Sequence, residues 1–181
     1  RPEKLVSYIR TSWASRVWDN LVTKSPMQRD RARRILVTGA AGYIGAHLVE
    51  ALCAWNQADL VIGVDIVEPS FEDERYRFAR RDIREPVVDL VRDHGIETVV
   101  HLAYVVAPTH DKGQMEAVNL NGAANVLEAC ASADVSHLIH MSSTIVYGLH
   151  PDNDVPLTEE SPLRASGDFT YAENKVRIER K

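Results

Sequence analysis

Three glycines spaced three residues apart, Gly39, Gly42 and Gly45, directly follow a short apolar run. The run Ile35–Thr38 is typical of a buried strand, and the pattern over Tyr43–Trp55 is typical of a helix. We expect the first glycine to permit a tight turn, the second to let the backbone approach a ligand, and the third to let helix and strand pack closely. Because free N–H groups at a helix N-terminus attract anions, this strand–turn–helix unit predicts a site for the pyrophosphate of a dinucleotide.

An acidic residue closes the second apolar run. Leu60–Val64 predicts a strand, and Asp65 follows it 26 residues after Gly39. An acid at this place accepts hydrogen bonds from the adenosine ribose hydroxyls. A 2′-phosphate would meet this carboxylate, and no Arg or Lys lies between Gly39 and Glu68 to offset it. The sequence therefore favours NAD over NADP as the cofactor.

From residue 33 onward, short β-branched runs alternate with helical patterns. This alternation predicts a doubly wound parallel α/β sheet of the Rossmann-like class, incomplete at its C-terminus. Further strands are expected at Tyr76–Ala79, Thr98–Ala103 and His137–Ser143, and helices at Pro86–His94, at Met115–Ala131 and from about Phe169. A long polar loop is expected over Gly148–Asp168. The longest apolar stretches are too short for an integral membrane segment.

Residues 1–32 differ from the domain expected over residues 33–181. Apolar residues recur every four positions within residues 1–26, with basic residues between them, which predicts an amphipathic extension. It would be a partner-docking helix, a membrane-surface helix or a transit peptide, unless Met27 is the natural start. The chain begins at Arg1, and its last residues fall within an uncapped helical pattern, so we expect a fragment.

Composition narrows the classes of partner and site. Residues 1–34 carry nine Lys and Arg against three Asp and Glu, whereas residues 35–181 carry twelve against twenty-three. An acidic body argues against nucleic acid as a partner. Two cysteines cannot form a disulfide framework, which favours a cytoplasmic location. No metal site is expected, since no His or Cys pair has ligand spacing.

Tyr171 and Lys175 are four residues apart in the last expected helix, so their side chains share one face. Tyrosine, with a reference pKa near 10, is a poor base at neutral pH. A neighbouring ammonium group lowers that pKa and suits the phenol to proton transfer with an alcohol oxygen. The fifth expected strand ends in hydroxyl-bearing residues over 141–148, where ligands bind in open α/β sheets.

The order of these motifs resembles that of extended short-chain dehydrogenases/reductases, within the NAD-dependent epimerase/dehydratase family that acts on nucleotide sugars. The resemblance runs from about Ile35 to Lys181. It implies a nucleotide-sugar substrate, and family analogy also suggests a homodimer. Ser143 matches the catalytic Ser/Thr, Tyr171 the acid/base, and Lys175 the residue that binds the nicotinamide ribose and tunes the tyrosine. The other matched cofactor residues are Tyr43 and Ile44 in the turn, Asp82 and Ile83 near adenine, His101, Leu102 and Ala103 along the cofactor, Ser142, and Asn119, which opens the following helix.

The sequence departs from the family pattern in three places. Tyr104 stands where a small residue is usual, which would narrow the nicotinamide side. The proline common before the catalytic tyrosine is absent from Arg164–Thr170, and the chain stops six residues after Lys175. Family dehydratases tend to carry Asp-Glu just after the catalytic Thr, whereas Thr144-Ile145 stands here. This difference favours an epimerase or a simple dehydrogenase.

Two other functions stay open. The first is a non-catalytic dinucleotide-binding module, and complete retention of Ser143, Tyr171 and Lys175 weighs against it. The second is a reductase of steroid or phenolic ketones. Because related reductases commonly prefer NADP, Asp65 weighs against this function.

Overall fold

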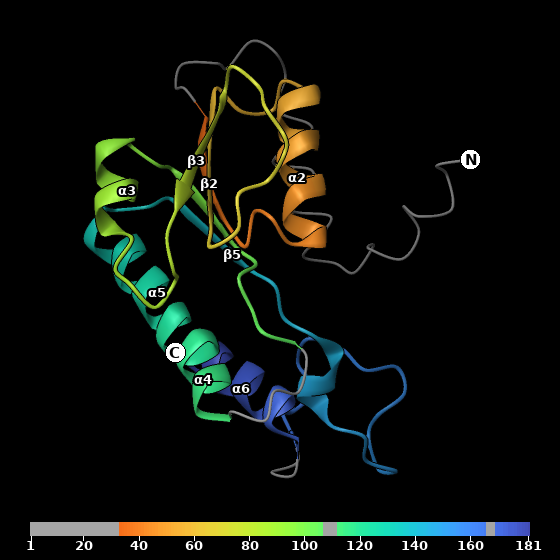
Figure 1. Cartoon of the computed structure of the whole chain (residues 1–181). Helices are drawn as coiled ribbons and strands as arrows, with labels where there is room; N and C mark the ends of the chain where they lie inside the picture. The colour runs from red at the N-terminus through yellow and green to blue at the C-terminus, as the bar shows by residue number, and fades with distance from the viewer. Residues whose placement is uncertain (1–32, 107–111, 166–168) are drawn as a thin grey trace. The chain divides into compact units, whose positions relative to one another are not determined.

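Five strands form one parallel sheet in the order β3-β2-β1-β4-β5 (Figure 1). The computed structural model describes residues 33–106, 112–165 and 169–181, so the predicted helix within residues 1–26 lies outside the described residues. The strands are β1 (Arg34–Thr38), β2 (Leu60–Asp65), β3 (Tyr76–Arg80), β4 (Thr98–His101) and β5 (His137–His140). Strand order reverses at β1, and ligands in such sheets bind outside the carboxyl ends of the strands at the reversal. The predicted doubly wound α/β class is confirmed.

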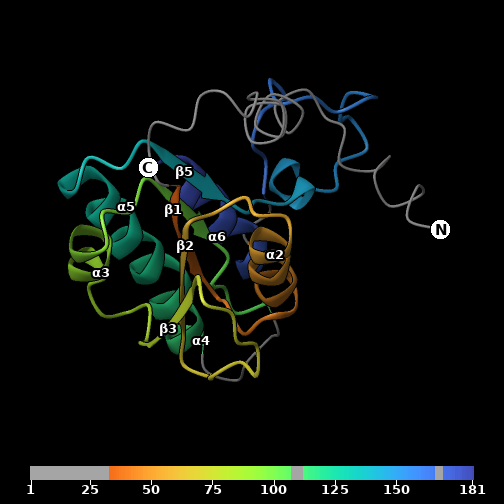
Figure 2. The same cartoon turned by 90° about the horizontal axis from the view of Figure 1, so that it is seen from above.

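Helices cover both faces of the sheet, with α2 on one side and α3 and α5 on the other (Figure 2). The helices are α2 (Tyr43–Ala54), α3 (Val88–Asp93), α4 (Lys112–Glu116), α5 (Gly122–Ser132) and α6 (Thr170–Glu179). A π-helical turn over Ala117–Asn121 joins α4 to α5, and a 3₁₀ turn covers Thr144–Tyr147. Within the described ranges, no helix combines the length and apolarity needed to span a bilayer.

The three central strands, β1, β2 and β4, are largely apolar, as expected for strands whose two faces are both buried. Ile35 and Val37 of β1 pack in the cluster that contains Cys53 of α2. Leu36, between them, packs in the cluster that contains Val126 of α5. Alternate residues of one strand thus supply the two halves of the core, and Cys53 is a packing residue, with burial raising the pKa of its thiol.

Several element ends differ from the sequence-based expectations, among them α3, which covers Val88–Asp93 instead of Pro86–His94. The fourth strand ends at His101, two residues early, because the Leu102 and Ala103 N–H groups turn to the Thr38 hydroxyl. The fifth strand ends at His140 instead of Ser143. The long helix begins at Lys112 rather than Met115 and contains the π-helical turn. π-helical turns inside helices occur frequently at functional sites.

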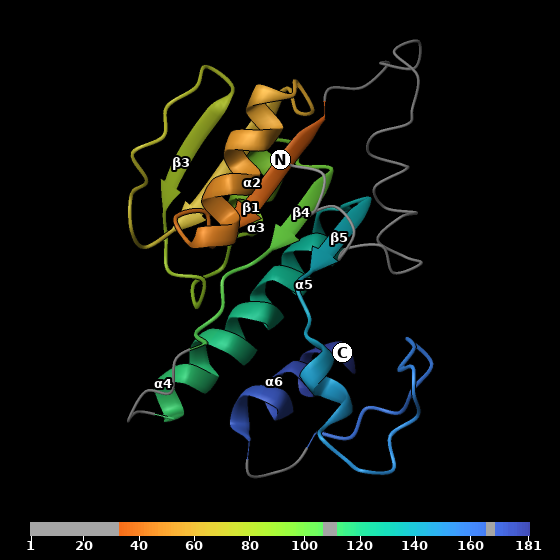
Figure 3. The same ribbon diagram turned by 90° about the vertical axis from the view of Figure 1, so that its right-hand side faces the viewer.

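Helix α6 lies beyond the carboxyl ends of β4 and β5 (Figure 3). Its residue Ile178 packs against Leu120 of the π-helical turn and Ala123 of α5. The end of the chain is therefore held against the helix that follows β4, at the same edge of the sheet where the glycine turn lies. This packing brings α6 towards the region where ligands bind in this class of fold.

Candidate functional site

The glycine turn joins β1 to α2 and has no room for side chains at two positions. Gly39 has a φ of +72°, and a Cβ there would lie 2.7 Å from the backbone nitrogen of Ala103. A Cβ on Gly45 would collide with the carbonyl oxygen of Gly39. Only glycine therefore keeps the turn packed against the end of β4 and α2 packed against the turn. Since α2 begins at Tyr43, the N–H groups of its first turn lie beside this loop without carbonyl partners in the helix.

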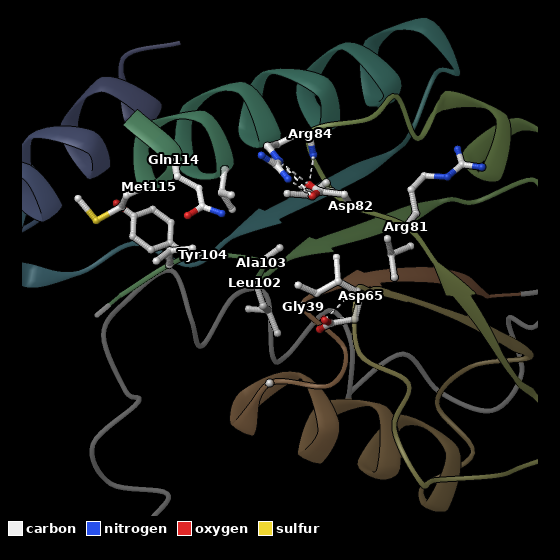
Figure 4. Close-up of a pocket in the computed structure, with 16 residues that line it drawn as sticks. Gly39, Asp65, Arg81, Asp82, Arg84, Leu102, Ala103, Tyr104, Gln114 and Met115 are labelled. Atoms are coloured by element: carbon white, nitrogen blue, oxygen red, sulfur yellow. Dashed lines mark hydrogen bonds and ion pairs between the residues drawn. The ribbon is translucent and has the colours of Figure 1, made fainter. Parts of the chain in front are cut away.

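A cavity of about 440 Å³ opens at the carboxyl ends of the strands around this turn (Figure 4). Arg81 stands at one end of the cavity, and Tyr104 at the other, beside Gln114 and Met115. The predicted cofactor residues that line it are Gly39, Gly42, Asp65, Asp82, Ile83, Leu102 and Ala103. These residues come from four separate stretches of sequence, and the fold brings them to one place.

Asp65 ends β2 and lines the cavity. One carboxylate oxygen accepts a hydrogen bond from the N–H of Ala41 at 2.9 Å. The other oxygen accepts from the N–H groups of Ile66 at 2.7 Å and Val67 at 3.2 Å. Backbone donors from the glycine turn and from the loop after β2 therefore orient this carboxylate.

Two arginines, Arg81 and Arg84, also line the cavity, although the sequence did not predict them as site residues. Arg84 pairs with Asp82 through both its backbone N–H and its guanidinium, which lowers the pKa of the Asp82 carboxyl. Arg81 pairs with Asp89 of α3. Both guanidinium groups are thus matched by carboxylates. The position of Arg81 directly after β3, and of Arg84 three residues later, was the signal in the sequence, because the segment that follows a parallel strand reaches the ligand-binding edge of the sheet.

Lys175 is buried on α6, with an exposed fraction of 3%. Its Nζ donates a hydrogen bond to the carbonyl oxygen of Met141 at 2.6 Å. The same atom lies 3.7 Å from the ring centroid of Tyr104 and 6.0 Å from that of Tyr171. Burial lowers the pKa of Lys175 to about 8, against the opposing charge of Glu179. Met141, whose carbonyl oxygen receives this ammonium group, directly follows β5.

Tyr171 and Lys175 share one face of α6 as predicted, but neither is among the described residues that line the cavity. Tyr171 packs edge-to-face against Tyr104, with ring centroids 5.4 Å apart and an interplanar angle of 80°. The Tyr104 hydroxyl donates to the backbone oxygen of Tyr171 at 3.3 Å. Tyr104 therefore touches both members of the predicted acid/base pair.

The two serines after β5 point to different partners. Ser143 caps the 3₁₀ turn, its Oγ accepting from the N–H of Ile145 at 3.4 Å. Ser142 Oγ donates to the Glu179 carboxylate on α6. Neither serine lines the cavity within the described residues, so their predicted roles stay predictions.

Asn119 lies inside the π-helical turn rather than at the opening of the helix, contrary to expectation. Its side chain is fully buried and clamps the backbone of Val105. The amide oxygen accepts from the Val105 N–H at 2.8 Å, and the amide nitrogen donates to the Val105 oxygen at 3.1 Å. Asn119 thus fixes the segment that follows β4 and does not itself line the cavity.

A neutral histidine pair lies beneath the carboxyl ends of β4 and β5. His101 and His140 are register partners and stack with ring centroids 5.4 Å apart. Thr38 Oγ1 accepts from two N–H groups, so its own hydrogen points to Nδ1 of His101 at 2.7 Å. Burial lowers the pKa of His101 to about 3 and that of His140 to about 4. Among the described residues, no group of three or more His, Cys, Asp or Glu side chains is arranged to hold a metal ion.

The histidine pair predicts that the folded protein loses stability in acid. The pKa of His101 in the folded protein lies below the reference value near 6.5, so the unfolded chain binds the proton first. The free energy of unfolding therefore falls as the pH drops below 6.5. His101 alone contributes a slope of about 1.4 kcal/mol per pH unit. Urea unfolding between pH 7 and 4.5 measures the slope. His140→Phe keeps the stacking and should reduce the slope, whereas His137→Asn, at an exposed position of β5, should leave it unchanged. Equal slopes for all three proteins would contradict the prediction.

Comparisons with known proteins identify the family and relatives to which this chain is similar. The model of the NAD dependent epimerase/dehydratase family matches residues 35–180. UDP-glucose 4-epimerase from Lactobacillus helveticus is 30% identical over 155 residues, covering 81% of this chain and 45% of that protein. Sterol-4-alpha-carboxylate 3-dehydrogenase, decarboxylating, from Homo sapiens is 30% identical over 158 residues, covering 85% of this chain and 40% of that protein.

Among solved structures, DesIV (dTDP-glucose 4,6-dehydratase) from Streptomyces venezuelae, with NAD and TYD bound, superposes with a TM-score of 0.70. It is 30% identical, and the match covers 81% of this chain and 49% of that chain. The chain thus spans less than half the length of these three relatives.

Proposed function

The chain belongs to the NAD dependent epimerase/dehydratase family, and we propose that it binds NAD and takes part in the oxidation and re-reduction of a hydroxyl group on a nucleotide sugar. The chemistry proposed is that of an epimerase or a related oxidoreductase. The observation that carries the proposal is the cavity that joins the glycine turn, Asp65 and Asp82 at the carboxyl ends of the strands. The similarity to a UDP-glucose 4-epimerase supports the substrate class.

The residues present fit a dinucleotide. Gly39 lets the turn pack against the backbone of Leu102 and Ala103, and the N–H groups of Tyr43 and Ile44 at the start of α2 are the donors that we assign to the pyrophosphate. Asp65 would accept from the adenosine ribose. Asp82 and Ile83 would contact adenine.

The ion pairs of the two arginines in the cavity wall favour NAD over NADP as the cofactor. A 2′-phosphate needs an uncommitted cation, and Arg81 and Arg84 are each matched by a carboxylate.

The proposed chemistry uses three side chains. Tyr171 exchanges a proton with the substrate hydroxyl through its phenol oxygen, and Ser143 donates a hydrogen bond to the same substrate oxygen. Lys175, one turn further along α6, holds the nicotinamide ribose. When bound, NAD would accept the hydride from the carbon that carries this hydroxyl group. An epimer of the sugar would result if the hydride returned to the opposite face of the oxidised sugar. No acid stands at Thr144 or Ile145 to assist loss of water, which favours epimerisation over dehydration.

Cofactor preference tests the proposal directly. We expect NAD to bind at least about tenfold more tightly than NADP, because a 2′-phosphate would face Asp65. Asp65→Ala should shrink this preference by removing both the repulsion and the ribose acceptor. Isothermal titration with both cofactors measures it. Asp59→Ala is the matched control, since Asp59 lies beside the opposite end of β2, where it accepts from the backbone of Arg33. NADP preference in the unmodified protein would overturn the proposal.

A second candidate is oxidation of a secondary alcohol on a non-sugar substrate such as a sterol. The 30% identity to a sterol-4-alpha-carboxylate 3-dehydrogenase favours it as much as the epimerase similarity favours a sugar. Asp65 and the NAD chemistry are common to both candidates. To separate the two candidates, the turnover of UDP-glucose is compared with the turnover of a 3-hydroxysterol. Oxidation of the sterol is followed by the absorbance of reduced NAD at 340 nm.

A further inference from the structure

Tyr104 lies at the boundary between the cavity and the Tyr171–Lys175 pair. Its side chain belongs to the cavity wall, at the end remote from Arg81 (Figure 4). Lys175 is almost completely buried and contacts the Tyr104 ring, yet it is not among the described residues of that wall. Asp65 lines the cavity, whereas the lysine ammonium group is covered by an aromatic ring.

Three contacts with Lys175 and Tyr171 hold the Tyr104 ring in this position. Its face receives the Lys175 ammonium group at 3.7 Å from the ring centroid, a cation–π contact. It packs edge-to-face with Tyr171. Its hydroxyl donates to the backbone oxygen of Tyr171. Displacing the ring from the lysine breaks all three contacts.

The backbone on both sides of Tyr104 is fixed. The N–H of Ala103 donates to the hydroxyl of Thr38 at 3.2 Å. On the other side, Val105 is bound through both its N–H and its carbonyl by Asn119. These bonds hold the loop that carries Tyr104, so the ring itself can leave Lys175 by rotation of the Tyr104 side chain without a displacement of the loop.

We propose that Tyr104 is a positioning residue that controls access of the nicotinamide half of NAD to Lys175. This inference rests on the proposed function, in which Lys175 holds the nicotinamide ribose. The adenosine half would enter the cavity beside Asp65 and Asp82, while the nicotinamide half must first displace the Tyr104 ring to reach Lys175. The free energy of that displacement lowers the affinity for NAD and leaves the affinity for ADP unchanged, because ADP ends before the nicotinamide ribose.

The test compares the affinities of ADP and NAD by isothermal titration in three proteins. In Tyr104→Ala the lysine is uncovered, and we expect NAD to bind about tenfold more tightly relative to ADP, the size expected for loss of one cation–π and one aromatic contact. Tyr104→Phe keeps the ring with its contacts to Lys175 and Tyr171 and loses the hydrogen bonds of the hydroxyl. Its ratio of NAD to ADP affinity should rise less than that of Tyr104→Ala, because both ring contacts remain. The ADP affinity itself reports whether each variant is folded.

Each alternative outcome is distinct. An unchanged ratio in Tyr104→Ala, or a selective loss of NAD affinity, overturns the proposal, since the ring would then be neutral or a direct nicotinamide contact. A Phe variant that behaves like the Ala variant also overturns it, because the hydroxyl bond and not the ring would be responsible. Absence of both ADP and NAD binding in all three proteins overturns the proposed function itself.

Discussion

Tyr171→Phe is expected to lower turnover by about three orders of magnitude while leaving the affinity for NAD within about twofold of its original value. The substitution removes one oxygen atom, and with it the only group on that ring that can exchange a proton with the substrate hydroxyl. The ring itself remains, so the edge-to-face contact with Tyr104 is kept. The Tyr104 hydroxyl bonds the backbone of Tyr171 and is also kept. Turnover is followed with the nucleotide sugar and affinity by titration with NAD.

Tyr76→Phe is the matched control for this experiment. Tyr76 lies on β3, and its buried hydroxyl has no hydrogen-bond partner in the described part of the chain. Its loss should leave both turnover and NAD affinity unchanged. If Tyr171→Phe weakened NAD binding as strongly as turnover, the phenol would be a binding group for the cofactor, and the assigned role would be wrong.

The central part of the fold was predictable because its sequence signals are local. The strand β1, the glycine turn and helix α2 each carry their own pattern, and Asp65 ends a strand that is apolar on both faces. Parallel strands present their carboxyl ends at one edge, so the convergence of Gly39, Asp65 and Asp82 on one cavity followed from the topology.

The arrangement around α6 was not predictable in the same way. The resemblance marked Tyr104 as unusual for its size, but periodicity carries no information on which side chain a ring will face. The contacts of Tyr104 with Lys175 and Tyr171 join residues about 70 positions apart in sequence. The position of Asn119 in a π-helical turn also depends on a tertiary partner, the Val105 backbone.

The glycine turn should be the most sensitive point of the cofactor site. We expect Gly39→Ala to weaken NAD binding by at least about 100-fold, equivalent to ~2.7 kcal/mol. Alanine there adopts a left-handed conformation at φ +72° and meets the backbone of Ala103 and Leu102, neither of which can rotate away. The turn must shift, and the N–H groups that follow it lose their alignment. Titration with NAD measures the loss.

Gly95→Ala separates this crowding from the intrinsic cost of the backbone conformation. Gly95 also has a positive φ, +58°, but the nearest atom to an added Cβ is the flexible Arg34 side chain at 3.6 Å. Both variants lose about 1–2 kcal/mol of stability to the left-handed conformation. Since Gly95 leads into the amino end of β4, away from the cavity, its variant should bind NAD as the unmodified protein does. If the two variants bound NAD equally well, the close packing of Gly39 on β4 would have no part in forming the cofactor site.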